Sequence, residues 1–145
     1  MNIIIKAIAD ELPPDAGALA SEAELEGYEH IRRLADEWAS GRNRFDQDGE
    51  ILLGAYKGER LVGVGGLSVE FSRRDWLRMR RFYVHPSARR QGTARSVAER
   101  LIVHGRHYTN TLTVHAADAR AARFWEKVGF APLARDGYTH LLEIK

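Results

Sequence analysis

The sequence predicts one domain of the α/β class, built from six or seven strands and about four helices. Three observations predict this. Short apolar runs with the period-two alternation of strands take turns with segments whose apolar residues recur at three- and four-residue spacing, as in amphipathic helices. The chain has 145 residues, enough for one hydrophobic core and too few for two, so we assign residues 1–145 to a single domain. A strand, a turn, a glycine-containing loop and a helix follow one another in its middle.

The composition excludes several classes of protein. There is no cysteine, so disulfides, thiolate metal sites and a cysteine nucleophile need not be considered. At the amino terminus, Ile3, Ile4 and Ile5 form an apolar run that Lys6 interrupts, which is shorter than a signal-peptide core and far shorter than a membrane span. We therefore expect a soluble cytoplasmic protein.

The first half of the chain begins with a strand and two helices. Residues 2–8 alternate weakly and predict the first strand. The Pro-Pro-Asp run at 13–15 starts a helix, and a second amphipathic helix follows and ends at Gly41. Two apolar runs over 51–56 and 61–69 are separated by four turn-forming residues, which predicts a β-hairpin.

In the strand that ends at Val84, the apolar side chains switch from one face of the strand to the other in the middle. Leu77 and Met79 lie on one face, while Phe82 and Val84 fall on the other. A β-bulge near residues 80–81 would reconcile the two halves, because one extra residue inverts the alternation. The sequence therefore predicts a bent strand just before the central loop.

The central loop has the properties of a phosphate-binding segment. Pro86 ends the strand because it has no N–H to donate, and residues 89–94 lead into a helix over about 93–104. A helix N-terminus offers unpaired N–H groups and a partial positive charge, and Gly92 lets an anion approach the backbone closely. The run Gly-x-x-x-x-Gly-Lys-Ser/Thr of a P-loop does not occur in the sequence.

Two motifs carry a resemblance to a known family. Arg89-x-x-Gly92-x-Ala94, placed after Val84-His85-Pro86, resembles the Arg/Gln-x-x-Gly-x-Gly/Ala signature of the GCN5-related N-acetyltransferase (GNAT) superfamily. After a strand around 112–114, residues 118–130 resemble the family pattern Asn-x-x-Ala-x-x-Phe-Tyr-x-Lys-x-Gly-Phe. The matched segments lie within residues 76–130.

The second motif is also a well-capped helix. Asp118 suits the N-cap, and Gly129 suits the C′ position after the last turn. Asp136 and Gly137 then mark a last hairpin, with residues 138–144 as its closing strand.

The resemblance implies the GNAT fold, a twisted, mostly antiparallel mixed sheet flanked by helices. It also implies that acetyl-CoA is the co-substrate, that an amine attacks its thioester directly, and that no metal takes part. The strand before the loop would contact the pantetheine arm and the thioester carbonyl, and the loop would bind the pyrophosphate. The residues that the resemblance assigns to acetyl-CoA are Phe82, Tyr83, Val84, Arg89, Arg90, Gln91, Gly92, Thr93, Ala94, Asp118 and Trp125.

The catalytic residues are less well defined than the co-substrate site. An amine with a pKa near 10.4 is mostly protonated at pH 7, which costs roughly 4.6 kcal/mol, so base catalysis is needed more than acid catalysis. Glu70 and His115, each at a strand end, are candidate bases, acting directly or through water. Trp125 stands where the family often has a tyrosine that protonates the thiolate, so Tyr138 or water would supply that proton.

The charge of the chain is divided unevenly. Residues 1–50 carry twelve acids and five bases, whereas residues 51–145 carry eight acids and seventeen bases. Eight arginines fall within 73–95, a field suited to a polyanion such as CoA. A nucleic-acid surface would want aromatic residues interleaved on a sheet or a recognition helix, and neither arrangement is evident, so we expect no nucleic-acid partner. The short apolar run at the amino terminus gives no reason to expect a membrane.

The amine acceptor is not identified by the sequence. The family's resemblance places the acceptor beside the first two helices and the last hairpin, where acids could attract a cationic amine. The residues there are Glu22, Glu24, Glu26, Glu29, Trp38 and Tyr138. We expect a monomer or homodimer that binds acetyl-CoA and an amine. A catalytically silent acetyl-CoA-binding module is the alternative, since Trp125 has no titratable proton.

Overall fold

A computed structural model describes residues 2–144, which form a seven-stranded mixed sheet with four α-helices and one short 3₁₀ helix. The predicted fold class is confirmed. The strands are β1 (Ile3–Ala7), β2 (Ile51–Lys57), β3 (Arg60–Val69), β4 (Leu77–Val84), β5 (Thr111–Val114), β6 (Ala131–Arg135) and β7 (Tyr138–Glu143). The helices are α1 (Ala16–Leu25), α2 (His30–Ser40), η1 (Pro86–Ala88), α3 (Thr93–Gly105) and α4 (Ala119–Val128).

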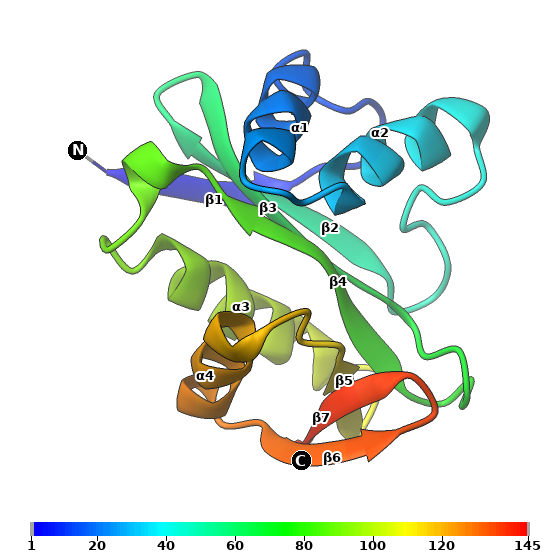
Figure 1. The fold of residues 1–145 in the computed structure, drawn as a ribbon. Helices are drawn as coiled ribbons and strands as arrows, with labels where there is room; N and C mark the ends of the chain where they lie inside the picture. Colours follow the sequence, from blue (N-terminus) through cyan, green and yellow to red (C-terminus); the bar gives the residue numbers. More distant parts are fainter. Residues whose placement is uncertain (1, 145) are drawn as a thin grey trace.

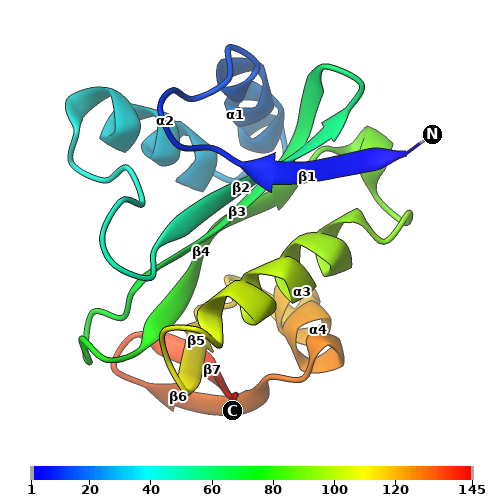
Figure 2. The ribbon, with the colours of Figure 1, turned by 180° about the vertical axis from the view of Figure 1, so that it is seen from behind.

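The sheet has the strand order β1-β2-β3-β4-β5-β7-β6. Every neighbouring pair is antiparallel except β4 and β5, which run parallel. Helices α1 and α2 cover one face, and α3 and α4 cover the other (Figures 1 and 2). Within residues 2–144, no helix is long and apolar enough to cross a membrane.

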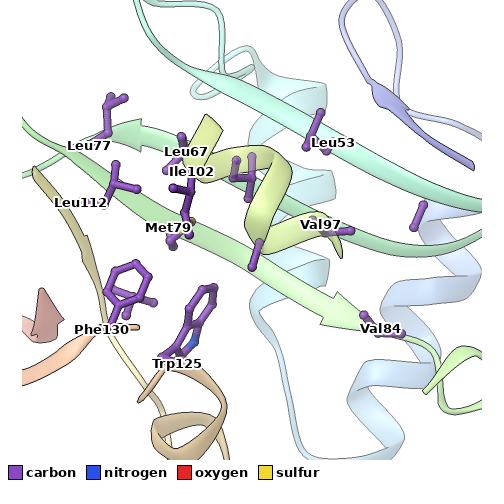
Figure 3. Packing of buried hydrophobic residues seen from close by; sticks show 14 of the residues in the cluster. Leu53, Leu67, Leu77, Met79, Val84, Val97, Ile102, Leu112, Trp125 and Phe130 are labelled. Atoms are coloured by element: carbon purple, nitrogen blue, oxygen red, sulfur yellow. The ribbon is translucent and has the colours of Figure 1, made fainter. Parts of the chain in front are cut away.

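Each face of the sheet buries its own hydrophobic cluster. Leu19, Ile31 and Leu34 of the first two helices pack on one side. Leu101 of α3 and Trp125 of α4 pack on the other, where Figure 3 shows Trp125 close to Phe130. The apolar residues whose spacing predicted the helices therefore face the sheet in each case.

The glycines of β3 serve close packing. A Cβ at Gly65 would lie 2.6 Å from the Phe82 ring, and one at Gly66 would lie 2.6 Å from the Phe45 ring. Distances this short are not tolerated in a packed interior, so these positions need glycine. The rings of Phe82 on β4 and of Phe45 in the loop after α2 can therefore pack directly against the backbone of β3.

The predicted bulge in β4 is confirmed. The pairing of β3 with β4 shifts register between Val64 and Gly66, and Arg81 adopts a left-handed conformation with φ of 57°. A bulge bends the strand that carries it and increases its twist. Beyond the bulge, β4 runs on towards Val84 without pairing to β5, whose last partner on β4 is Met79.

Candidate active site

The main cleft of the molecule lies where β4 and β5 separate. The two strands pair only from Leu77 with Leu112 to Met79 with Val114, and β5 then ends. The cleft has a volume of about 1140 Å³ and is lined by the rest of β4, the start of α3, the start of α4 and the connection between α1 and α2. The sheet itself therefore opens a slot beside the central loop.

One end of the cleft is built to bind an anion. Gly92 has φ of 77°, and nothing lies within 4 Å of the place that its Cβ would occupy. The N–H groups of Thr93, Ala94 and Arg95 have no acceptor among residues 2–144, and the buried Thr93 hydroxyl has no partner there either. Unpaired donors at a helix N-terminus, with a clear approach over glycine, fit a phosphate group.

Arg89, which the resemblance assigns to acetyl-CoA, lines the cleft and also binds the end of α1. Its guanidinium donates to both carboxylate oxygens of Glu26, at 2.8 and 2.5 Å, and its Nε donates to the Val84 carbonyl at 2.9 Å. Glu26 also accepts from the Tyr83 hydroxyl. The hydrogen bonds from Arg89 lower the pKa of Glu26 to about 2, against the opposing effect of burial. Arg89 thus fastens the loop to the end of α1 while it also lines the cleft.

The other loop residues divide between two surfaces. Arg90, Gly92, Thr93 and Ala94 line the main cleft. Gln91 instead lines a separate depression beside β1, and its amide donates to the Ser87 carbonyl at 3.2 Å. The structure therefore brings most of the predicted loop residues to the cleft and leaves the Gln91 side chain outside it.

Aromatic side chains form the wall of the cleft between the strands. Trp125 is buried and packs edge-on against Phe82, with ring centroids 4.9 Å apart, and both residues line the cleft. Tyr83 also contributes to the cleft, but its ring lies in the cluster under α1 and α2. These rings offer an apolar surface to a bound molecule.

A hydrogen bond joins the two walls of the cleft. Asp118 caps α4 by accepting from the Ala121 N–H at 2.8 Å, as predicted from the sequence. Its second oxygen accepts from the Tyr28 hydroxyl at 3.1 Å, and both Tyr28 and Asp118 line the cleft. The connection before α2 and the start of α4 are held together at this point.

Glu70 lies outside the cleft and is buried. Its carboxylate accepts from Arg78 Nε at 2.6 Å, from the Thr113 hydroxyl at 2.8 Å, and from the N–H and hydroxyl of Ser72. Burial alone would raise the pKa of Glu70, but these hydrogen bonds outweigh burial and lower the pKa to about 2. A carboxylate that is fully paired and weakly basic is poorly suited to accept a proton from a substrate.

We expect the Glu70→Gln substitution to act on stability rather than on the cleft. It leaves the buried Arg78 charge without its partner, and breaking a buried ion pair costs roughly 3–5 kcal/mol. Asp75→Asn, which removes an exposed pair with Arg73, is the matched control and should change little. Denaturant unfolding measures both, and calorimetry should show unchanged acetyl-CoA affinity in each variant.

The pH dependence of the same variant provides a second measurement. Because the pKa of Glu70 falls from 4.5 to about 2 on folding, its contribution is complete above pH 4.5 and is lost as the pH falls towards 2. The stability difference between wild type and Glu70→Gln should shrink over that range. A normal unfolding curve combined with lost turnover would instead identify Glu70 as a catalytic base.

The other two predicted catalytic residues are placed differently from each other. Tyr138 is buried against Trp76, with ring centroids 6.4 Å apart, and does not line the cleft. His115 is exposed and lines the cleft just beyond the end of β5. Of the three, only His115 can reach a ligand in the cleft from its present position.

His30, which the sequence did not single out, also lines the cleft. Its Nε2 lies 2.8 Å from the Phe82 carbonyl, which can only accept, so Nε2 carries the proton. Burial lowers the pKa of His30, and the charges of Arg81 and Arg33 add to this, so the ring is neutral at pH 7. Its Nδ1 has no partner among residues 2–144 and is free to accept a proton.

The fold places the unpaired N–H groups of α3 beside a cleft between two separating strands, an arrangement that fits a phosphate-bearing ligand. The chain belongs to the Acetyltransferase (GNAT) family, whose model matches residues 9–130. A search of curated protein sequences gave no match.

Three solved structures illustrate the shared fold. A putative acetyltransferase from Exiguobacterium sp. 255-15 superposes with a TM-score of 0.88 at 22% identity, covering 99% of this chain and 94% of that one. The putative acetyltransferase yncA from Salmonella typhimurium, solved with acetyl-CoA, gives 0.70 at 18% identity, covering 99% and 94%. The PaiA N-acetyltransferase from Thermoplasma acidophilum, solved with coenzyme A, gives 0.69 at 17% identity, covering 100% and 99%.

Proposed function

We propose that this protein is an acetyl-CoA-dependent N-acetyltransferase in which an amine attacks the thioester directly. The observation that carries the proposal is the separation of β4 from β5 beside the unpaired N–H groups at the start of α3. Family membership supports acetyl transfer, and two structures of similar fold were solved with acetyl-CoA or coenzyme A. The transfer to nitrogen and the residues below are our own assignment.

We place acetyl-CoA along the cleft in one direction. We place the pyrophosphate on the N–H groups of Gly92 to Arg95, with Arg90 close enough to add positive charge. The pantetheine arm then lies along the free part of β4, against Phe82 and Trp125. Its thioester faces the bulge, and the amine approaches from the side of Arg80 and Arg81.

The reaction requires a base near the bulge. As the amine nitrogen bonds to the thioester carbon, the carbon–sulfur bond breaks and the nitrogen loses a proton. We assign His30 Nδ1 as the acceptor of this proton, because the ring is neutral and the Phe82 carbonyl stabilises the proton on Nε2. His115 is the second candidate, directly or through water.

Protonation of the departing CoA thiolate requires little catalysis. A thiol with a pKa near 8.5 prefers its proton at pH 7 by only about 2 kcal/mol, so water in the cleft can supply it. Trp125 cannot donate a titrating proton, and Tyr138 lies outside the cleft. We therefore assign Trp125 a packing role beside the pantetheine arm.

The proposal is tested by incubating the protein with acetyl-CoA and a pooled amine library. Release of free thiol, together with acetylated amine detected by mass, supports transfer to nitrogen. Calorimetric binding of acetyl-CoA without any acetylated product would instead support the silent binding module. Trp125 is the observation that favours this second function.

A further inference from the structure

The part of the cleft that we assign to the amine is positively charged. The residues that line it, on β4 and at the start of α2, include four arginines beside a single carboxylate, that of Glu29. These arginines are Arg33, Arg78, Arg80 and Arg81. A cationic amine would meet like charges here, at a cost that rises as the site excludes water.

Three of the four acids that the sequence placed near the acceptor are paired with arginines. Glu24 pairs with Arg32 at 3.0 Å, and Glu29 pairs with Arg33 at 3.4 Å. Glu26 is held by Arg89, as described above. These pairs leave less free negative charge on this side to attract a cationic acceptor.

Arg80 differs from its neighbours because it has no carboxylate partner among residues 2–144. Arg78 pairs with Glu70, and Arg81 donates to Glu37 at 2.8 Å. Arg80 makes one hydrogen bond, to the Ser68 hydroxyl at 3.3 Å, and stacks on the exposed ring of Phe71 at 4.9 Å.

The acids nearest to Arg80 are occupied elsewhere. Glu37 binds Arg81, and the two carboxylate oxygens of Glu50 accept from the N–H groups of Gln47 and Val69. Burial lowers the pKa of Arg80, and the charge of Arg81 lowers it further. A half-buried guanidinium beside a like charge is costly unless an anion joins it.

Arg81 adds a second unsatisfied donor. Its side chain is only 9% exposed, it lines the cleft, and its Nε has no hydrogen-bond partner among the described residues. Buried donors of this kind are rare in folded proteins and call for an explanation such as a bound ligand. Two adjacent arginines, placed together by the bulge, thus retain unused capacity for an anion.

We propose that the amine acceptor is a small molecule that also carries a carboxylate or phosphate group, and that Arg80 binds this anionic group. The inference rests on the proposed acetyl transfer and specifies its substrate class. A guanidinium binds either group through two parallel hydrogen bonds, which would fix the distance and direction of the amine. Arg80 is then a determinant of specificity, and Arg81 supports it with a second charge.

The test compares acceptors matched in size but not in charge. Rates of acetyl transfer are measured for amino acids, for their carboxamides, for aminoalkyl phosphates and for diamines. We expect an amino acid or an aminoalkyl phosphate to exceed its uncharged or cationic counterpart in kcat/KM by about tenfold or more, the effect of one charge-assisted hydrogen bond. Whichever of the two anionic acceptors, amino acid or aminoalkyl phosphate, is acetylated faster identifies the anionic group.

The variant Arg80→Gln should remove this preference. It should raise KM for the anionic acceptor about tenfold or more while leaving the rate with the carboxamide and the KM for acetyl-CoA unchanged. Arg74→Gln is the matched control, because Arg74 is exposed and does not line the cleft. This control should behave like wild type with every acceptor.

Two results overturn the inference while acetyl transfer stands. One is that carboxamides or diamines are acetylated as well as the anionic amines, and the other is that Arg80→Gln keeps the full preference. If no amine in any arm is acetylated although calorimetry shows acetyl-CoA bound, the proposed function itself fails, and the inference with it.

Discussion

The substitution Gly92→Val is expected to abolish acetyl-CoA binding. Gly92 stands at the N-cap of α3 with φ of 77°, and open space lies where its Cβ would be. A valine there would place its side chain in front of the N–H groups that we assign to the pyrophosphate. Losing two or more such charge-assisted hydrogen bonds should weaken binding at least about 100-fold, and the thermal shift caused by acetyl-CoA should vanish.

The backbone cost of this substitution has to be separated from its effect on the ligand. A side chain in the left-handed region costs roughly 1–2 kcal/mol at any such position. Gly58 has φ of 64°, also has nothing within 4 Å of its Cβ position, and lies in the turn between β2 and β3, away from the cleft. Gly58→Val should lower the melting temperature similarly while keeping the full acetyl-CoA shift. An undiminished shift in Gly92→Val would refute the assignment of the loop.

The features predicted correctly from the sequence depend on residues close together in the chain. The bulge followed from the change of parity between Met79 and Phe82, and it is present at Arg81. The caps of α4 followed from Asp118 and Gly129, because caps are set by dihedral preference and by side chains within three residues. These predictions from neighbouring residues are correct because tertiary packing favours the same local conformations.

The contacts that the sequence did not indicate all join residues that are distant in the chain. The motif assigns Arg89 to the pyrophosphate, but Glu26 lies 63 residues earlier and no local pattern indicates that the end of α1 reaches the loop. Glu70 stands at a strand end, where a catalytic base is reasonable. That it is enclosed by Arg78 and Thr113 depends on how β3, β4 and β5 align. Charge alone could not distinguish a paired residue from a free one.

His30 illustrates the same limit from the opposite side. It opens α2 without any motif around it, and only the packing of α2 across β4 brings its ring to the Phe82 carbonyl, 52 residues away. The bulge contributes as well, because it sets the backbone beside Phe82 at an angle to the sheet. The geometry that suggests His30 as a base is thus a neutral imidazole whose Nε2 is hydrogen-bonded and whose Nδ1 is free to accept a proton.

The substitution His30→Gln is expected to lower kcat by about 10²- to 10⁴-fold, the usual contribution of a general base. Glutamine can place its amide nitrogen near the position of Nε2 and keep the hydrogen bond to the Phe82 carbonyl, but it has no basic lone pair. Acetyl-CoA affinity and the melting temperature should therefore change little. His115→Gln, which changes the other histidine of the cleft, is the matched comparison and should cost much less.

The pH profile distinguishes a base from a packing residue. Only the neutral ring can accept a proton, and burial lowers the pKa of His30 from 6.5. Wild-type kcat/KM, calculated for the neutral form of the amine, should therefore rise with pH below 6.5 and level off above it. In His30→Gln this limb should disappear, and the residual rate should depend on hydroxide or added buffer base. If the limb persisted in His30→Gln and disappeared in His115→Gln, the base would be His115, and His30 would serve only to hold the Phe82 carbonyl.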